Sequence, residues 1–310
     1  MSIFSKSNSR SHDINTGIAF MAIAMFMLPG IDAIAKHLSS SVPAGQVTWA
    51  RFAFQTLILL PFMWSSLRHL AAKDVLPQAI RGLTLALATM FIFAAVQIMP
   101  IADAIAIFFV EPFILALISA VFLGETIGWR RYSAIFIGFI GALLVIQPSW
   151  ALFGWTATLP LAAALSFAIY LALTRRQSQR YGAFALQFSA GLSGLIFMSV
   201  GLGVGQQIGF QPFDPVWASP SAWLWMMAVG VISLVGHLLI TTAFQRVAAS
   251  ILAPLSYLEI IGATLFGWAF FNDFPRPLTW LGVAVIVTSG LYMIRREAIR
   301  AAADDAAETA

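Results

Sequence analysis

Cysteine is absent from this 310-residue chain, and charged residues are scarce, at 10% of the sequence. Without cysteine, disulfides, thiolate metal sites and a cysteine nucleophile are excluded. Soluble domains carry roughly 25% charged residues, so the composition also argues against a soluble protein. The sequence has no phosphate-binding glycine loop, no H-E-x-x-H motif and no cluster with metal-ligand spacing. We therefore expect neither a cofactor nor a metal, and ATP-driven chemistry is disfavoured.

The chain is rich in long apolar runs. Apolar residues make up 60% of it, and its mean hydropathy is +0.88. A membrane-spanning helix needs about 20 mostly apolar residues. Ten such runs can be placed, at about 14–36, 44–64, 76–99, 102–123, 131–147, 154–174, 183–203, 221–243, 250–271 and 278–294. The sequence therefore predicts an all-α integral membrane protein with ten transmembrane helices.

The basic residues fall mostly on one side of this arrangement. With the N-terminus in the cytoplasm, 14 of the 17 Lys and Arg residues face the cytoplasm, Lys36 and Arg276 lie outside, and Arg51 lies within a span. The positive-inside rule therefore predicts a multi-pass protein of a bacterial inner (plasma) membrane with both termini cytoplasmic. The same asymmetry explains the isoelectric point near 9.8 without a nucleic-acid partner.

The second half of the chain repeats the first at a spacing of 148 residues. The matched pairs are Gln97 and Gln245, Glu111 and Glu259, Phe122 and Phe270, and Glu125 and Asp273. We divide the chain into a first repeat at 1–150, a second repeat at 151–297 and a cytoplasmic tail at 298–310. Each repeat holds an odd number of spans, so the second must enter the membrane from the opposite side. The prediction is two inverted five-helix repeats around a central cavity.

Ionisable side chains inside spans mark candidate functional residues, because each costs about 2.5–3.5 kcal/mol at the bilayer centre. Glu111 and Glu259 lie near the midplane and would face one central space. They are candidates for proton coupling or for contact with a substrate amine, with helix packing as the alternative. Arg51 suits a carboxylate, either of a substrate or of Glu111. His237 is a third candidate for proton coupling, unless a neighbouring carbonyl simply satisfies it. Asp32 is expected to pair with Lys36, one turn away.

Other side chains at similar depth complete the predicted cavity. They are Trp49, Gln55, Phe108, Ser166, Tyr170, Ser256 and Tyr257, with packing or lipid contact as the alternative for the aromatic ones. Helix breakers occur near the same depth, at Pro29, Gly30, Pro112 and Pro254. Proline and glycine in a spanning helix permit kinks, and we expect these to act where the cavity opens and closes.

A catalytic alternative is a serine and histidine dyad. Gly191-Leu192-Ser193-Gly194 matches the G-x-S-G string of intramembrane serine proteases, and His237 lies on the next helix. The dyad would require these two side chains within hydrogen-bond reach, together with oxyanion donors.

Several short motifs carry a resemblance to a known family. Val110-Glu111-Pro112-Phe113, Phe122-Leu123-Gly124-Glu125 and the glycines at 138 and 141 look like the E-P, L-G-E and glycine-rich signature of EamA-type ten-helix transporters. Arg51-Phe52 resembles the R-F of the family's second helix, and Lys36 the lysine that often ends its first. The chain thus resembles the drug/metabolite transporter (DMT) superfamily over residues 14–296. Ile260 and Asn272-Asp273 depart from the pattern, and there we expect the two gates to differ.

Within the family, the chain looks closest to the YddG-type amino-acid exporters. The resemblance implies a secondary transporter that works by alternating access, with helices 1–4 and 6–9 around the cavity and helices 5 and 10 outside. We expect export of amino acids, including aromatic and large neutral ones, and related metabolites across the inner membrane, by a monomer or weak homodimer. The alternatives are an importer or exchanger of another small metabolite, such as S-adenosylmethionine, and, more distantly, an intramembrane serine protease.

Overall fold

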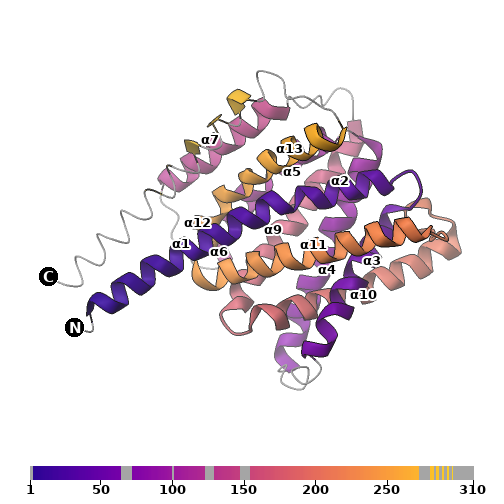
Figure 1. Ribbon diagram of the computed structural model, residues 1–310, viewed down its shortest axis with the longest axis horizontal. Helices are drawn as coiled ribbons and strands as arrows, with labels where there is room; N and C mark the ends of the chain where they lie inside the picture. Colours follow the sequence, from indigo (N-terminus) through magenta and orange to yellow (C-terminus); the bar gives the residue numbers. More distant parts are fainter. Residues whose placement is uncertain are drawn as a thin grey trace.

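The chain folds into a bundle of helices (Figure 1). The computed structural model describes residues 3–63, 72–99, 101–122, 129–146 and 154–271, with single positions between 280 and 295. Within them, five helical segments are long and apolar enough to cross a membrane, namely Asp13–Leu38, Asp74–Ile98, Gly154–Ser178, Ala183–Ile208 and Pro220–Arg246. Shorter apolar helices occur at Glu111–Phe122 and Leu255–Phe270. The protein is therefore an all-α, multi-pass membrane protein.

The helices follow the order of the predicted spans. The first half contains α1 (Ile3–Met27), α2 (Pro29–Leu38), α3 (Ala44–Met63), α4 (Ala72–Ile98), α5 (Ile101–Phe108), α6 (Glu111–Phe122) and α7 (Trp129–Ile146). The second contains η2 (Gly154–Ala157), α9 (Thr158–Ser178), α10 (Ala183–Ile208), η3 (Gln211–Phe213), α11 (Pro220–Arg246), α12 (Ala249–Leu252), η4 (Ala253–Leu258) and α13 (Glu259–Phe271). Most of the expected tenth span, the tail at 298–310 and Asn272-Asp273 lie outside the described residues.

Three of the predicted spans are discontinuous. The first divides into α1 and α2 at Pro29, which begins α2. The fourth divides into α5 and α6 at residues 109 and 110, and the ninth runs as α12, the 3₁₀ segment η4 and α13. Glu111 is the first residue of α6, and Glu259 is the first residue of α13. Each carboxylate therefore sits at the positive end of a helix dipole beside a break, as at the ion and substrate sites of transporters with broken helices.

The two halves repeat their contacts as well as their sequence. The Gln97 amide at the end of α4 donates to the Val42 carbonyl over 3.4 Å, and the matched Gln245 near the end of α11 donates to the Tyr181 carbonyl over 3.2 Å. Phe109 and Tyr257, 148 residues apart, contact each other with ring centroids 5.7 Å apart. Matched residues can touch only near the axis that relates the repeats, so this axis passes close to Glu111 and Glu259.

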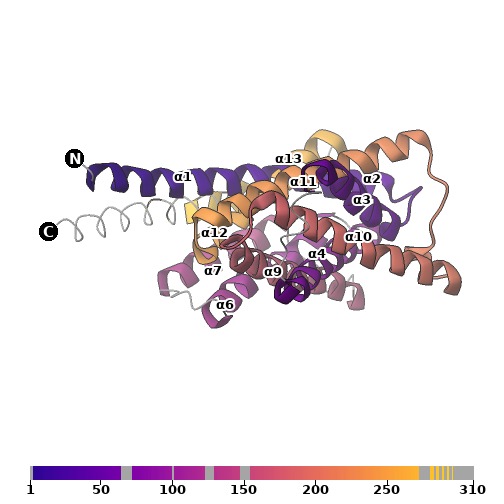
Figure 2. The same cartoon turned by 90° about the horizontal axis from the view of Figure 1, so that it is seen from below.

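Helices from the two halves pack against each other throughout the bundle. The helix α4 lies against α9, α3 against α10, and α1 against α11. Figure 2 shows α1 beside α11, with its N-terminal part extending beyond the bundle. Close approach is made by small residues, since a Cβ on Gly194 of α10 would come within 2.8 Å of the Phe52 ring of α3. The interior of the protein is therefore an interface between the halves.

Candidate functional site

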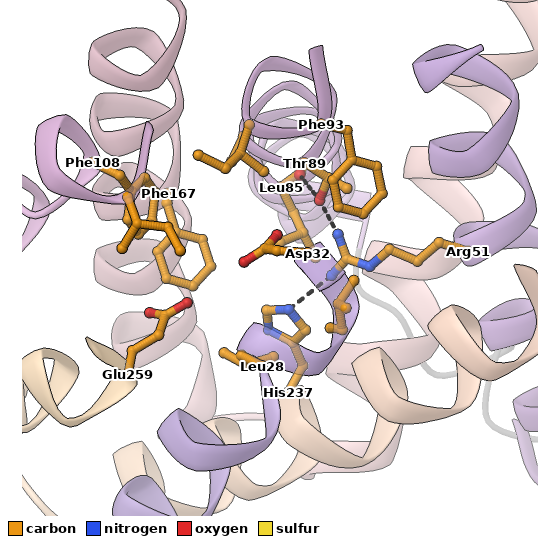
Figure 3. A pocket seen from close by; sticks show the side chains of 14 residues that line it. Leu28, Asp32, Arg51, Leu85, Thr89, Phe93, Phe108, Phe167, His237 and Glu259 are labelled. Carbon is orange, nitrogen blue, oxygen red and sulfur yellow. Dashed lines mark hydrogen bonds between the residues drawn. The ribbon is translucent and has the colours of Figure 1, made fainter. Parts of the chain in front are cut away.

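A pocket lies where the two halves meet (Figure 3). The first half lines it from α2 to α5 and from Leu28, which precedes α2, and the second half from α9, α11 and α13. Its volume of about 70 Å³ is far below the roughly 300–1,000 Å³ of pockets that hold whole ligands. The polar lining residues are Asp32, Arg51, Thr89, His237 and Glu259. The structure therefore presents a contracted, charged space that must widen before it can hold a metabolite.

Arg51 of α3 carries the positive charge of this pocket. Its side chain is buried, with 3% of its surface exposed. One terminal nitrogen donates to the Thr89 hydroxyl of α4, and the other lies 2.7 Å from Nε2 of His237. Its Nε has no hydrogen-bond partner, and among the described residues no carboxylate comes within ion-pair distance. The ion pair between Arg51 and Glu111, one of the two expected roles, is thus not formed, and the guanidinium keeps a free donor.

The contact with Arg51 determines which ring nitrogen of His237 carries the proton. A guanidinium can only donate, so Nε2 of the imidazole must accept. The proton then resides on Nδ1, which lies 3.3 Å from the Tyr170 hydroxyl of α9. A doubly protonated imidazole has no acceptor left and would lose the bond to Arg51. His237 is thus held as a neutral imidazole that accepts a hydrogen bond from Arg51 and donates one to the Tyr170 hydroxyl.

A chain of hydrogen bonds continues from the pocket into the second half. The Gln187 amide of α10 donates to the Tyr170 hydroxyl over 3.2 Å and to the Thr241 hydroxyl over 2.7 Å. Gln55, one turn beyond Arg51 on α3, donates to the Gln187 carbonyl over 2.7 Å. Gln55 and Tyr170 are fully buried. The network ties α3, α9, α10 and α11 together behind the pocket and holds Arg51 and His237 in place.

The acidic side of the pocket is formed by Asp32 of α2 and Glu259 of α13. Each is buried, with 8% of its surface exposed. Neither carboxyl has a hydrogen bond or ion pair in the described part of the chain, and the expected pair between Asp32 and Lys36 is not formed. The Asp32 carboxyl lies between Arg51 and the side of the pocket where Glu259 and Phe167 lie (Figure 3). Two buried carboxyls thus face the same space from different halves.

Glu111 was expected to face the same central space as Glu259, but it does not line the pocket. It is 1% exposed, and its Oε1 has no hydrogen-bond partner among the described residues. Its nearest polar neighbours include Ser256 and Tyr257 of η4, and its charge is also close enough to act on Glu259. The structure thus brings Glu111, Ser256, Tyr257 and Glu259 together around the two helix breaks.

The remaining predicted residues lie at different distances from the pocket. Phe108 is in its wall. The Trp49 indole points to α10 and donates to the Ser199 hydroxyl over 2.9 Å, and Ser166 is half-buried outside the lining. Pro29 is the first residue of α2, Pro112 is the second residue of α6, and Pro254 is the second residue of the 3₁₀ segment η4. Gly30 faces the Phe266 ring of α13.

The catalytic dyad is not assembled. Ser193 packs against Gly82 of α4, whereas both nitrogens of His237 face Arg51 and Tyr170. Over the described ranges, no hydrogen bond joins Ser193 to His237.

Three residues of the site, namely Thr89, Phe167 and Gln187, were missed by the sequence reasoning, and Asp32 was expected only to pair with Lys36. The spacing of Leu28, Ile31 and Asp32 already indicated one face of a helix, and all three line the pocket. Phe167 occupies the lining position that was assigned to its neighbour Ser166, an error of one residue in helical phase. Gln187 gave no signal, since its role depends on three other helices.

A helical membrane protein with paired broken helices and a charged pocket between two repeats has the architecture of a secondary transporter. The chain belongs to the EamA-like transporter family, whose model matches residues 15–147 and again residues 154–295. Both halves of the chain therefore correspond to the same family unit.

Characterised relatives transport different small molecules. The chain is 28% identical to the pseudopaline exporter of Pseudomonas aeruginosa strain UCBPP-PA14, over 91% of this chain and 97% of the relative. It is 26% identical to the S-adenosylmethionine uptake transporter of Rickettsia conorii, over 91% and 93%, and 26% identical to the riboflavin transporter of Rhizobium johnstonii, over 91% of each. A solved crystal structure matches with a TM-score of 0.70 at 19% identity, over 93% of this chain and 98% of the other, which supports the fold alone.

Proposed function

We propose that this protein is a secondary transporter that exports amino acids, including aromatic and large neutral ones, and related metabolites across the bacterial inner membrane by alternating access. Both termini would be cytoplasmic. Arg51 is the observation that carries the substrate class. A buried guanidinium with a free Nε and, among the described residues, no carboxylate within ion-pair distance suits a substrate carboxylate, because planar donors match that group. Apolar and aromatic walls at Phe93, Phe108 and Phe167 favour a substrate with an apolar side chain.

Alternating access requires the contracted pocket to widen on one side at a time. The breaks at Pro29, at residues 109 and 110 and along η4 are the places where helix segments can tilt without disrupting whole spans. Coupling to protons is the second part of the proposal. Glu111 and Glu259 lie at two of these breaks, so gain or loss of a proton there would act directly on the moving segments.

An uptake assay with the purified protein in liposomes tests the proposal. Labelled phenylalanine, leucine, lysine and glutamate form the panel, and protein-free liposomes give the background. Phenylalanine and leucine should enter faster than background, and Arg51→Gln should reduce their flux at least about tenfold, as expected when a charge-assisted hydrogen bond is lost. Flux equal to background for the whole panel would refute the proposal. Comparing right-side-out with everted membrane vesicles then gives the direction.

Uptake or exchange of S-adenosylmethionine is the second candidate. One relative is named as an S-adenosylmethionine uptake transporter. This compound carries an amino-acid group together with a positively charged sulfonium. The acidic side of the pocket suits such a charge. Labelled S-adenosylmethionine in the same liposomes decides between the two candidates, because at equal concentration the preferred substrate will suppress the flux of the other more strongly than the reverse.

A further inference from the structure

The acidic side of the pocket combines features that call for a positively charged ligand group. Asp32 and Glu259 are each more than nine-tenths buried and line the pocket. Within the described part of the protein, neither carboxyl has a hydrogen bond or an ion pair within 4 Å, and the charge of Arg51 acts on Asp32 only from beyond that distance. A buried carboxylate without a partner is costly, and a cation placed between the two would remove that cost. The carboxyls come from α2 and α13, so such a cation would be held by both halves.

The walls around these carboxyls also suit an organic cation. Phe108 and Phe167 line the same side of the pocket with ring centroids 5.7 Å apart, and the Phe167 ring lies 6.0 Å from the His237 ring. Aromatic faces attract ammonium groups and exclude water from them. Among the described residues, no three acidic, histidine or cysteine side chains converge to hold a metal ion. An ammonium group therefore fits these surroundings better than a metal.

We propose that Asp32 and Glu259 form a subsite for the ammonium group of the substrate, walled by Phe108 and Phe167. This subsite deepens the proposed function and rests on it for the rest of the substrate. Arg51 takes the carboxylate at one end of the pocket, and Asp32, which lies between Arg51 and Glu259 (Figure 3), takes the amine beside it. The two charged sides would orient every amino acid in the same way, with its side chain left over for the apolar wall.

Three related probes separate the two sides of the pocket. Phenylalanine has both charged groups, phenethylamine has only the amine, and 3-phenylpropionate has only the carboxylate. Binding of each labelled probe to the full-length protein in nanodiscs is measured for the wild type, Asp32→Asn, Glu259→Gln and Arg51→Gln. Asp74→Asn is the matched control, because Asp74 is buried on α4 but binds Tyr181 over 2.6 Å and Arg180 over 3.6 Å, away from the pocket.

The subsite predicts a selective pattern of losses. Asp32→Asn and Glu259→Gln should each lower the binding affinity for phenethylamine and for phenylalanine at least about tenfold, because each removes one charge-assisted contact. Both variants should keep an affinity for 3-phenylpropionate within about twofold of wild type, because this probe lacks the amine. Retained binding of 3-phenylpropionate also shows that the variants are folded. Arg51→Gln should give the reverse pattern, and Asp74→Asn should change none of the three.

Two kinds of result would overturn the subsite. One is unchanged phenethylamine binding in both acidic variants, or no phenethylamine binding by the wild type. The other is an equal loss of all three probes, which would give Asp32 and Glu259 a purely structural role. The proposed function is tested separately in the same experiment. Wild-type protein that binds phenethylamine but not phenylalanine would keep the subsite and refute amino-acid transport, whereas the converse would refute only the subsite.

Discussion

At the scale of single residues, the pocket depends on how each charge finds or lacks a partner. Arg51 is held by the neutral groups of Thr89 and His237, which leave its charge available to a ligand. Across the same space, Asp32 and Glu259 form no hydrogen bond and no ion pair within 4 Å with the residues that the structure describes. The pocket therefore has a basic side and an acidic side before any substrate binds.

His237 is predicted to position Arg51 by accepting a hydrogen bond. His237→Gln keeps an acceptor beside Arg51, whereas His237→Leu removes it and leaves a buried donor unsatisfied, at a cost of about 1–3 kcal/mol. The leucine variant should therefore raise the KM for phenylalanine and lower the Tm more than the glutamine variant. Liposome kinetics and thermal melts measure the two effects. Equal behaviour of both variants would show that the acceptor is irrelevant.

Glu111 and Glu259 are predicted to link transport to protons. Glutamine cannot release or take up a proton in their place, so phenylalanine flux in Glu111→Gln or Glu259→Gln should lose its dependence on an imposed pH gradient. The measurement is initial flux with and without the gradient, compared with wild type and with Asp74→Asn. If both variants kept the wild-type pH response, these protons would play no part in coupling.

At the scale of the elements, the breaks in the helices define the site more than the helices themselves. The segments α6 and α13 each begin at an acidic residue, and Phe109 and Tyr257 meet between them. The helix α13 also packs against α2. Gly262 of α13 faces Pro29 in this contact. The moving parts of the proposed cycle therefore meet through small residues.

The contact at Gly262 gives a prediction with a built-in control. A Cβ at Gly262 would lie 2.9 Å from the Phe26 carbonyl oxygen and 3.1 Å from Cγ of Pro29, whereas a Cβ at Gly203 of α10 meets nothing within 4 Å. Gly262→Ala should lower the free energy of unfolding by about 1–3 kcal/mol through overpacking. Gly203→Ala should leave it unchanged or raise it by up to about 1 kcal/mol. Thermal melts in detergent check both, and a neutral Gly262→Ala would contradict the packing.

The sequence predicted the order and approximate limits of the helices, because apolar run length determines where a chain can span a membrane. The internal repeat predicted that Glu111 and Glu259 face one central space, whereas Glu259 lines the pocket and Glu111 does not. The sequence could not predict the phase of α9 to one residue, so Ser166 was assigned the place of Phe167. Arg81 is one of the 14 basic residues assigned to the cytoplasmic side, and the structure shows that its side chain is fully buried in α4. Counting basic residues along the sequence does not show which of their side chains are buried against another helix.

At the scale of the whole molecule, the halves are joined by buried polar contacts as well as by apolar packing. Arg81 of α4 donates to Gln78 on its own helix and to the Ser189 hydroxyl of α10 over 2.9 Å. It also donates to the Leu186 carbonyl of α10, and its guanidinium lies 5.8 Å from the centre of the Tyr170 ring of α9. Any motion that separates α4 from α9 and α10 must break these contacts.

Arg81→Gln is predicted to loosen the joint between the halves. Losing the hydrogen bonds of a buried charged group should cost about 1.5–3 kcal/mol of stability, read as a lower Tm. A double variant with Ser189→Ala should cost less than the sum of the two single changes, because the residues share one contact. Strict additivity of the two effects would show that the contact carries no energy.

Counterflow in liposomes tests the central claim most directly, because only a carrier that exchanges its site between the two sides can drive it. Liposomes containing the protein are loaded with unlabelled phenylalanine and diluted into a trace of labelled phenylalanine. We expect transient accumulation of label above the external concentration, and loss of that accumulation in Arg51→Gln. Absence of accumulation with wild-type protein across the amino-acid panel, or equal accumulation in Arg51→Gln, would contradict it.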